Sequence, residues 1–187
     1  MLLILYLAFL IFAILFSILL ILFYIEAGIT FFRRTAPQLP SERKLRDAVV
    51  SEIRKHYPDA RTAIDIGSGW GGMARRIARE FPNMRVVGVE LMPLAFACSR
   101  LARLFLGPRN CRFVMGDAIK YAARAKNKQF DIAVCYSGDR LMKAVAPLAG
   151  RFKVVLSLDF PMPGKKAARV IKLHKDRLGQ HMLYVYK

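Results

Sequence analysis

A glycine-rich segment at residues 63–72 is the part of the sequence best suited to bind a ligand. The run Ala-Ile-Asp-Ile-Gly-Ser-Gly-Trp-Gly-Gly leads from an apolar, strand-like stretch into a turn and then into a helical pattern. Glycine has no Cβ atom, so a ligand can approach the backbone closely there. The spacing of Gly67, Gly69 and Gly72 also satisfies the dinucleotide-binding fingerprint, so the glycines alone do not decide which cofactor binds.

Three carboxylates at the ends of predicted strands narrow the choice of cofactor. Asp65, two residues before the first glycine, would hold the cationic amino group of a methionine-like moiety, directly or through water, and would repel a pyrophosphate. Glu90, at the end of the next strand, suits a ribose diol. Asp117 follows the third strand, where an acidic side chain can accept a hydrogen bond from an adenine amino group. A helix cap at Asp117 and a solvated strand end at Glu90 are simpler readings, but the joint occurrence favours one binding site.

The elements that must position these residues alternate between strands and helices. Short apolar runs predict buried strands, and the stretches between most of them have helical spacing, as in Met73, Ile77 and Phe81. This repetition predicts a doubly wound, mainly parallel, Rossmann-like α/β sheet. The predicted strands are Thr62–Ile66, Arg85–Glu90, Cys111–Met115, Phe130–Tyr136 and Phe152–Leu158.

The two ends of this domain have their own signals. Ser41 is a plausible N-cap for a first helix that ends before Pro58. Ala168–His174 and His181–Tyr186 are strand-like and are joined only by Lys175–Gln180. Since no crossover helix fits between them, they are expected to form an antiparallel hairpin at the end of the sheet, which disfavours a dehydrogenase. Residues 41–187 are predicted to form a single domain.

Residues 1–25 predict a transmembrane anchor. The stretch has no charged side chain and one clearly polar residue, Ser17, and it is long enough to cross the bilayer core. A cleavable signal peptide would need a basic start and a small-residue cleavage site, neither of which is convincing here. A buried helix of a soluble protein would show a polar face. Residues 26–40, with prolines at 37 and 40, form the predicted linker.

Charge predicts the orientation and the partners of the chain. Basic residues follow the span closely, so the positive-inside rule places the domain on the cytoplasmic or matrix-equivalent side of a single-pass protein. The formal net charge of +18 would attract an anionic lipid surface or nucleic acid. The anchor beside an anionic leaflet accounts for this charge, so a nucleic-acid partner is not favoured. The three cysteines have no metal-like spacing and suit reduced, buried thiols.

With these features, residues 41–187 resemble the class I S-adenosylmethionine-dependent methyltransferases, whose sheet also ends in an antiparallel hairpin. Within that class the chain is most similar to the small membrane-anchored protein-lysine methyltransferases, which include the mitochondrial enzymes acting on the adenine nucleotide translocase and on the ATP synthase c subunit. The supporting motifs are Asp65-Ile-Gly-Ser-Gly69, Gly88-Val-Glu-Leu-Met-Pro93 leading to Ser99-Arg100, and Phe160-Pro-Met-Pro163.

The resemblance implies S-adenosylmethionine as the cofactor. The residues expected to bind it are Asp65, Gly67, Ser68, Gly69, Gly71, Glu90, Leu91, Asp117 and Ala118. The sequence departs from the subfamily at Trp70, where an acidic residue is usual, and at Gly72, where an arginine is usual. The loop at 136–139 lacks the expected proline, and Asp159 stands where a basic residue is usual. These departures concern the amine substrate more than the cofactor.

Methyl transfer is an in-line displacement at a sulfonium carbon, so alignment and desolvation are the main tasks of such an enzyme. The reaction requires no metal, and the sequence predicts no metal site. A lysine acceptor must first lose a proton, which burial favours. Tyr136 is predicted to line the methyl-transfer pocket, and Asp139 or Asp159 to contact the incoming amine. The simpler readings are an interfacial aromatic residue and helix-capping or solvated carboxylates.

The expected acceptor is a lysine of a membrane protein near the bilayer face, because no lid domain is predicted that would enclose a small molecule. A lipid headgroup or a small membrane-soluble molecule is the alternative. RNA is a third acceptor class, although the sequence after the fourth strand lacks the Asn/Asp-Pro-Pro-Tyr pattern of adenine-amino methylation. A function of a different class is also open, in which the chain is a membrane-tethered binding protein that does not catalyse a reaction.

Overall fold

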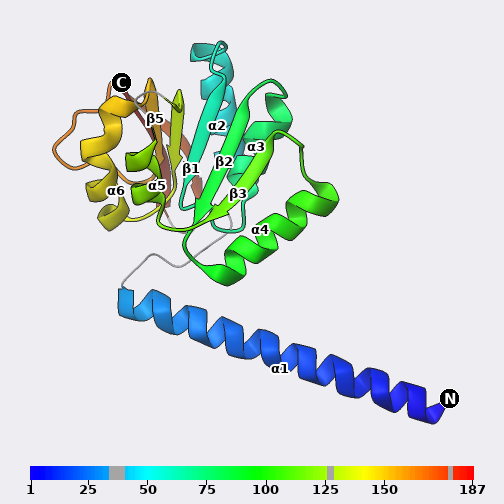
Figure 1. Ribbon diagram of the computed structural model, residues 1–187. Helices are drawn as coiled ribbons and strands as arrows, with labels where there is room; N and C mark the ends of the chain where they lie inside the picture. Colours follow the sequence, from blue (N-terminus) through cyan, green and yellow to red (C-terminus); the bar gives the residue numbers. More distant parts are fainter. Residues whose placement is uncertain (34–40, 126–128, 177–178) are drawn as a thin grey trace. The chain divides into compact units, whose positions relative to one another are not determined.

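The computed structural model describes residues 1–33, 41–125, 129–176 and 179–187, and the chain divides into two units, residues 1–37 and 38–187 (Figure 1). The described part of the first unit is one helix, α1 (Leu2–Arg33). Its stretch Leu2–Ile25 is long and apolar enough to cross a membrane, a property that signal sequences share. The helix continues beyond Ile25 into the predicted linker. The prolines expected to end it lie outside the described residues.

The second unit is built on a seven-stranded sheet with the order β3-β2-β1-β4-β5-β7-β6. β1 to β5 pair in parallel, whereas β7 is antiparallel to both β5 and β6. This topology confirms the predicted doubly wound α/β fold with its C-terminal hairpin. The strands are β1 (Thr62–Ile66), β2 (Arg85–Glu90), β3 (Cys111–Met115), β4 (Ile132–Cys135), β5 (Val154–Leu158), β6 (Arg169–Asp176) and β7 (Gly179–Tyr186).

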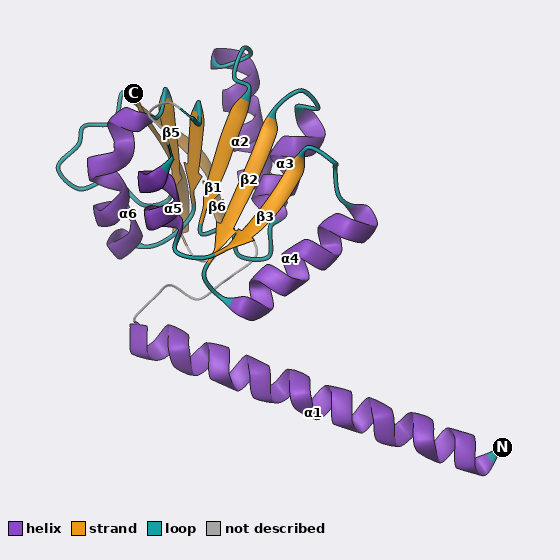
Figure 2. Ribbon diagram, in the orientation of Figure 1, coloured by secondary structure: helices purple, strands orange, loops and turns teal. Residues whose placement is uncertain are grey.

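Helices cover both faces of this sheet, and Figure 2 shows α2 and α3 on one side and α5 and α6 on the other. The helices are α2 (Arg43–His56), α3 (Gly72–Glu80), α4 (Pro93–Leu106), α5 (Ala118–Arg124) and α6 (Asp139–Val145), followed by the 3-10 turn η1 (Ala146–Arg151). Because both faces are covered, the central strands are mostly apolar instead of alternating regularly with polar residues.

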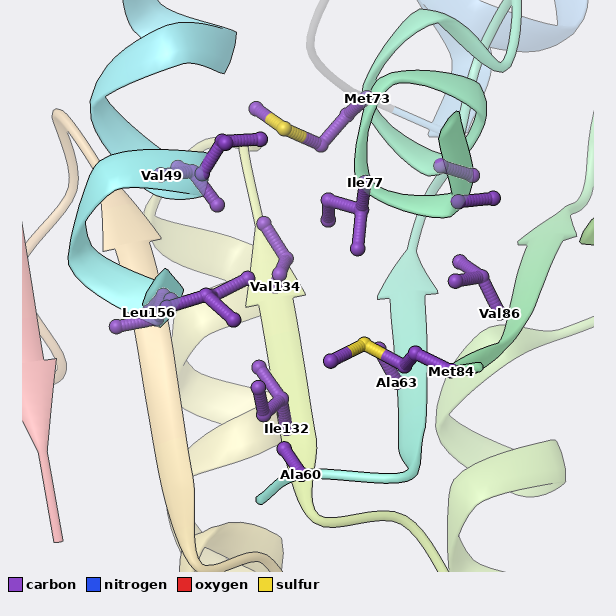
Figure 3. Packing of buried hydrophobic residues seen from close by; sticks show 14 of the residues in the cluster. Val49, Ala60, Ala63, Met73, Ile77, Met84, Val86, Ile132, Val134 and Leu156 are labelled. Atoms are coloured by element: carbon purple, nitrogen blue, oxygen red, sulfur yellow. The ribbon is translucent and has the colours of Figure 1, made fainter. Parts of the chain in front are cut away.

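The central strands contribute to two separate apolar layers. Ala63 of β1 packs in the cluster beneath α2 and α3, whereas its neighbour Ile64 packs in the cluster beneath α5 and α6. Figure 3 shows the first cluster, in which Val49, Ile77 and Val134 come from three different elements. Burying a side chain of this size contributes roughly 1.5–3 kcal/mol. These layers fix the strands whose ends carry the candidate site.

Several local expectations differ from the structure. Strands β4 and β5 each begin two residues later than predicted, and β4 ends one residue earlier. Glu42, not Ser41, is the residue before the first turn of α2, and its side chain makes no capping hydrogen bond. The backbone carbonyl of Ser41 instead accepts a hydrogen bond from the guanidinium of Arg46. The hairpin strands also extend further than predicted, to Asp176 and from Gly179. Backbone pairing across the hairpin continues through polar residues that apolar patterning does not reveal.

Asp131 holds together the amino ends of three strands. Its Oδ2 accepts hydrogen bonds from the backbone N–H groups of Arg61 (2.8 Å) and Thr62 (3.0 Å), and its Oδ1 lies 2.7 Å from Nζ of Lys153. Burial alone would raise the pKa of Asp131, but the hydrogen bonds from Lys153, Arg61 and Thr62 outweigh it and keep the pKa below its ordinary value. This carboxylate therefore stabilises the sheet at the end opposite the glycine-rich turn.

We predict that Asp131→Ala lowers the free energy of unfolding by about 1–3 kcal/mol, because it leaves the partly buried backbone donors of Arg61 and Thr62 without their acceptor. In the wild type this contribution is present above the ordinary aspartate pKa and is lost as the pH falls below it, because the pKa is lower in the folded state. Urea unfolding followed by the fluorescence of the single tryptophan, Trp70, measures the change.

The matched control is Asp59→Ala, which removes an exposed carboxylate from the turn before β1. It should change the unfolding free energy by no more than about 0.5 kcal/mol. Equal destabilisation by the two substitutions would contradict the role given to Asp131.

Candidate active site

The turn after β1 is a tight glycine loop at the carboxyl edge of the sheet. The backbone N–H groups of Gly67 and Ser68 both donate to the carbonyl of Val89, at 3.1 and 3.0 Å. Gly67, Gly69 and Gly71 have φ values of 75°, 52° and 72°, in the left-handed region that side chains rarely adopt. At Gly69 no described atom lies within 4 Å of where a Cβ would stand. The loop therefore offers backbone that a ligand can approach.

The ring of Phe113 packs against this loop and gives a second reason why two positions must be glycine. A Cβ at Gly71 would lie 2.5 Å from Cζ of Phe113, and a Cβ at Gly88, which is paired with Phe113 across β2 and β3, would lie 2.6 Å from the same ring. Gly71 was predicted to bind the cofactor. In the structure its lack of a side chain is already required by the Phe113 ring, which is buried.

Glu90 connects the glycine loop to the end of β2. Its Oε2 accepts a hydrogen bond from the N–H of Gly69 at 2.6 Å, and its Oε1 accepts from the N–H groups of Leu91 and Met92, both at 2.8 Å. The side chain is buried, with 4% of its surface exposed. Hydrogen bonds to a charged acceptor are stronger than neutral ones. Glu90 is thus more than a solvated strand end, because it fixes the position of the loop.

Asp65 is the most deeply buried acidic residue of the predicted site, with 3% of its surface exposed. Its Oδ2 accepts a hydrogen bond from the N–H of Ala74 in the first turn of α3, at 3.2 Å. Burial raises the pKa of Asp65 to about 7; the hydrogen bond from Ala74 acts in the opposite direction, and the charge of Glu90 adds to the increase. Such a carboxylate is stabilised by a cation that enters the pocket.

The third predicted carboxylate is more exposed and serves as a helix cap. Asp117 precedes α5, and its Oδ1 accepts hydrogen bonds from the N–H groups of Ile119 (2.9 Å) and Lys120 (3.1 Å). Asp117 is therefore a helix cap, as the simpler interpretation of the sequence predicted. It also lies at the end of β3, where an adenine contact is expected. Ala118 is buried beside it, and Leu91 is 38% exposed at the end of β2.

The predicted acceptor residues separate into a pair and a single residue. Tyr136 follows β4 and forms a side-chain hydrogen bond with Asp159, which follows β5. Burial, together with the negative charge of Asp159, raises the pKa of Tyr136 to about 12. Asp139 lies in the first turn of α6 with its side chain exposed. Tyr136 and Asp159 therefore form one site, and no described contact joins Asp139 to them.

His181 completes this pair and was missed by sequence reasoning. Its Nδ1 lies 2.7 Å from Oδ2 of Asp159, and the N–H of Met182 donates to Oδ1 of the same carboxylate at 2.9 Å. Asp159 has a φ of 63°, unusual for a residue with a side chain. The sequence held a signal for His181, because it shares the strand face of Leu183 and Val185, which are buried.

Known proteins resemble this chain in sequence and in fold. Residues 63–147 match the family model described as a methyltransferase domain. The tRNA1(Val) (adenine(37)-N6)-methyltransferase of two Porphyromonas gingivalis strains is 36% identical over 75 residues, which is 38% of this chain and 29% of that protein. The chain thus spans less than a third of the length of these curated relatives.

Solved methyltransferases share the fold over most of both chains. An RNA methyltransferase from Salinibacter ruber, in complex with S-adenosyl-L-homocysteine, superposes with a TM-score of 0.63 and 22% identity, covering 79% of this chain and 92% of that one. The precorrin-6y C5,15-methyltransferase from Geobacter metallireducens superposes with a TM-score of 0.62 and 17% identity, covering 82% and 92%.

These matches confirm the family predicted from the sequence, whose cofactor is S-adenosylmethionine. The matched segment begins in β1 and includes the glycine loop, Glu90 and Asp117, which are the residues that the sequence selected for the cofactor. The chain therefore contains a segment, residues 63–147, that matches a methyltransferase domain, and it has the fold of the solved methyltransferases.

Proposed function

We propose that this chain is a membrane-anchored S-adenosylmethionine-dependent methyltransferase that modifies a lysine side chain of a membrane protein. The observation that carries the proposal is the buried carboxylate of Asp65, whose pKa is raised to about 7 beside the glycine loop. In a family whose cofactor has a cationic amino group, such a carboxylate has an evident partner.

The residues around the loop fit this cofactor. Asp65 would hold its amino group, Glu90 its ribose and Asp117 its adenine, and the glycine loop, which lacks side chains at Gly67 and Gly69, would leave room for its methionine part. The hydroxyl of Ser68 is buried and has no hydrogen-bond partner among the described residues, so it is available to a polar group of a ligand. When bound, S-adenosylmethionine supplies a methyl group on a sulfonium sulfur.

The acceptor side of the site suits a cationic substrate. Asp159 accepts hydrogen bonds from Tyr136 and from the backbone of Met182, and it contacts His181. Its negative charge would attract a protonated lysine, and Tyr136 would line the apolar pocket in which that lysine loses its proton. Both residues lie at the carboxyl ends of neighbouring strands, the edge at which α/β sheets bind their ligands.

Membrane attachment restricts which acceptors reach this site. Leu2–Ile25 is apolar along its whole length, and the basic residues that follow favour a domain on the cytoplasmic or matrix-equivalent side. The net charge of +18 would hold the domain at an anionic lipid surface. A lysine near the membrane face of another membrane protein is the acceptor that this arrangement favours, with a lipid headgroup amine as the alternative.

RNA is a second candidate acceptor, because the curated relatives are tRNA methyltransferases and the chain is strongly basic. One sequence feature argues against adenine-amino methylation. The residues after β4 are Tyr136-Ser137-Gly138-Asp139, which differ from the Asn/Asp-Pro-Pro-Tyr pattern of that reaction. The experiments below distinguish the two acceptors.

Calorimetry should show that the full chain binds S-adenosylmethionine and that Asp65→Ala combined with Glu90→Ala weakens binding at least about 10- to 100-fold, the effect of losing charge-assisted hydrogen bonds of roughly 1.5–3 kcal/mol. Asp59→Ala, on the exposed turn before β1, is the control and should bind like the wild type. The cofactor assignment fails if the wild type does not bind or if the double variant binds equally well.

The affinity for S-adenosylmethionine should fall as the pH drops below about 7, by roughly tenfold per pH unit, until the lower pKa of Asp65 in the complex is reached. The reason is that Asp65 must release its proton to meet the cationic amino group. Asp65→Asn should remove this acidic limb and leave any alkaline limb that belongs to the ligand.

Folding provides an internal check on the same residue. Because the pKa of Asp65 is higher in the folded state than in the unfolded chain, its ionisation costs stability as the pH rises from about 4 to about 7. Asp65→Asn should therefore melt at the same or a higher temperature than the wild type at pH 8. An acidic limb that persists in Asp65→Asn would show that another group is responsible.

A methyl donor labelled in its methyl group, incubated with the full chain and its membranes, should place the label in a protein band and, after hydrolysis, in methylated lysine. Label in the organic extract would instead support a lipid acceptor, and label in RNA would support the second candidate. The double variant at Asp65 and Glu90 is the control without cofactor binding. If labelling does not exceed that of the control, the result would support a binding protein that does not catalyse methyl transfer.

A further inference from the structure

Four side chains outside the predicted site form a compact group that we name the hairpin cluster, composed of Glu42, His174, Asp176 and His181. One possible ligand atom from each residue lies within 4.8 Å of those of the other three. His174 and Asp176 belong to β6, His181 belongs to β7, and Glu42 precedes α2. The cluster contains two of the three histidines of the chain.

An irregularity in the hairpin brings the two histidines together. The register is Lys172 with Met182 and then Lys175 with Gln180, so β6 has one more residue than β7 between these pairs. This β-bulge places His174 beside His181, and the centres of their rings lie 4.8 Å apart.

The side chain of Gln180 satisfies the backbone at this bulge. Its Nε2 donates to the carbonyls of Leu173 (2.9 Å), His181 (3.1 Å) and His174 (3.3 Å). The distorted backbone is therefore stabilised by its own side chain. Bulges often redirect a side chain next to a functional site.

His181 is oriented as a metal-binding histidine is. Its Nδ1 contacts Oδ2 of Asp159 at 2.7 Å, and an Nδ1–H that donates to a carboxylate leaves a lone pair on Nε2. The His181 side chain is 7% exposed, and its Nε2 is buried. That atom lies 3.0 Å from Oδ2 of Asp176. A lone pair and a carboxylate oxygen at this distance repel each other unless a positive charge lies between them.

The other histidine of the hairpin cluster also contacts a carboxylate. Nε2 of His174 lies 2.9 Å from Oε2 of Glu42. Two imidazole nitrogens and two carboxylate oxygens are a donor set that Zn²⁺ and other divalent transition metals bind in proteins. One such ion would balance the charges of Glu42 and Asp176, with Asp159 behind His181 as the carboxylate that orients it.

We propose that Glu42, His174, Asp176 and His181 bind one divalent transition-metal ion, with Zn²⁺ as the best match. The ion joins the start of α2 to the C-terminal hairpin and holds His181 against Asp159. Because Asp159 is also bonded to Tyr136, the metal positions the acceptor side of the proposed methyl-transfer site without taking part in the transfer. The metal site stands on its own geometry and does not require that transfer.

The test uses the full chain in detergent, without a histidine tag, after removal of metals with a chelator. Titration with Co²⁺, followed by visible absorption, and competition for Zn²⁺ with a chromogenic chelator give the stoichiometry and the affinity. We expect one ion per chain. His174→Ala and Glu42→Gln should each weaken binding at least about tenfold, and Asp159→Asn by about 10- to 100-fold through the orientation of His181.

The controls separate metal binding from folding. Glu42 is on the surface, so Glu42→Gln should keep the melting temperature of the metal-free protein. His56→Ala removes the histidine outside the cluster, which pairs with Glu52, and should bind Co²⁺ and Zn²⁺ like the wild type. The proposal is overturned if the wild type binds less than one ion, or if His174→Ala binds as tightly as His56→Ala. In that case a proton on Nε2 of His181 would neutralise Asp176 instead.

Discussion

The carboxyl ends of five parallel strands meet at one edge of the sheet, and each part of the candidate site depends on that arrangement. β1 and β4 lie side by side in the sheet, although two strands and three helices lie between them in the sequence. The connections on the two sides of this point lead to opposite faces of the sheet. The loops after the strands therefore diverge at this point, where α/β sheets commonly bind their ligands, and residues far apart in sequence come together there.

The charges buried at this edge of the sheet are opposite in sign to the net charge of the chain. The chain carries 31 basic and 13 acidic side chains, yet the carboxylates of Asp65 and Glu90 are both buried at the glycine loop. Glu90 is stabilised by three backbone N–H groups, whereas Asp65 has a pKa raised by burial and by its neighbour. One carboxylate thus maintains the loop, while the other has the raised pKa that makes it the proposed partner of a cationic ligand group.

The segment that matches the methyltransferase family model ends before the proposed acceptor side of the site is complete. The family match covers residues 63–147, which include Tyr136, whereas Asp159 and His181 come later in the chain. This division agrees with the chemistry of the family, since one cofactor is shared and many acceptors are used. The bulged hairpin, with its histidines and carboxylates, lies outside the segment that the family model matches.

The sequence by itself determined the strands, the glycine loop and the family. The bounds of β1, β2 and β3 could be predicted because buried parallel strands are short, mostly apolar runs, and Asp65 and Glu90 could be found because they lie at or near the carboxyl ends of such runs. Only the tertiary structure showed that Phe113 requires glycine at two positions, that Asp159 pairs with Tyr136, and that the bulge brings His174 beside His181. Local patterning reports which face of an element is buried, but contacts between distant segments depend on packing and register, which no single segment encodes.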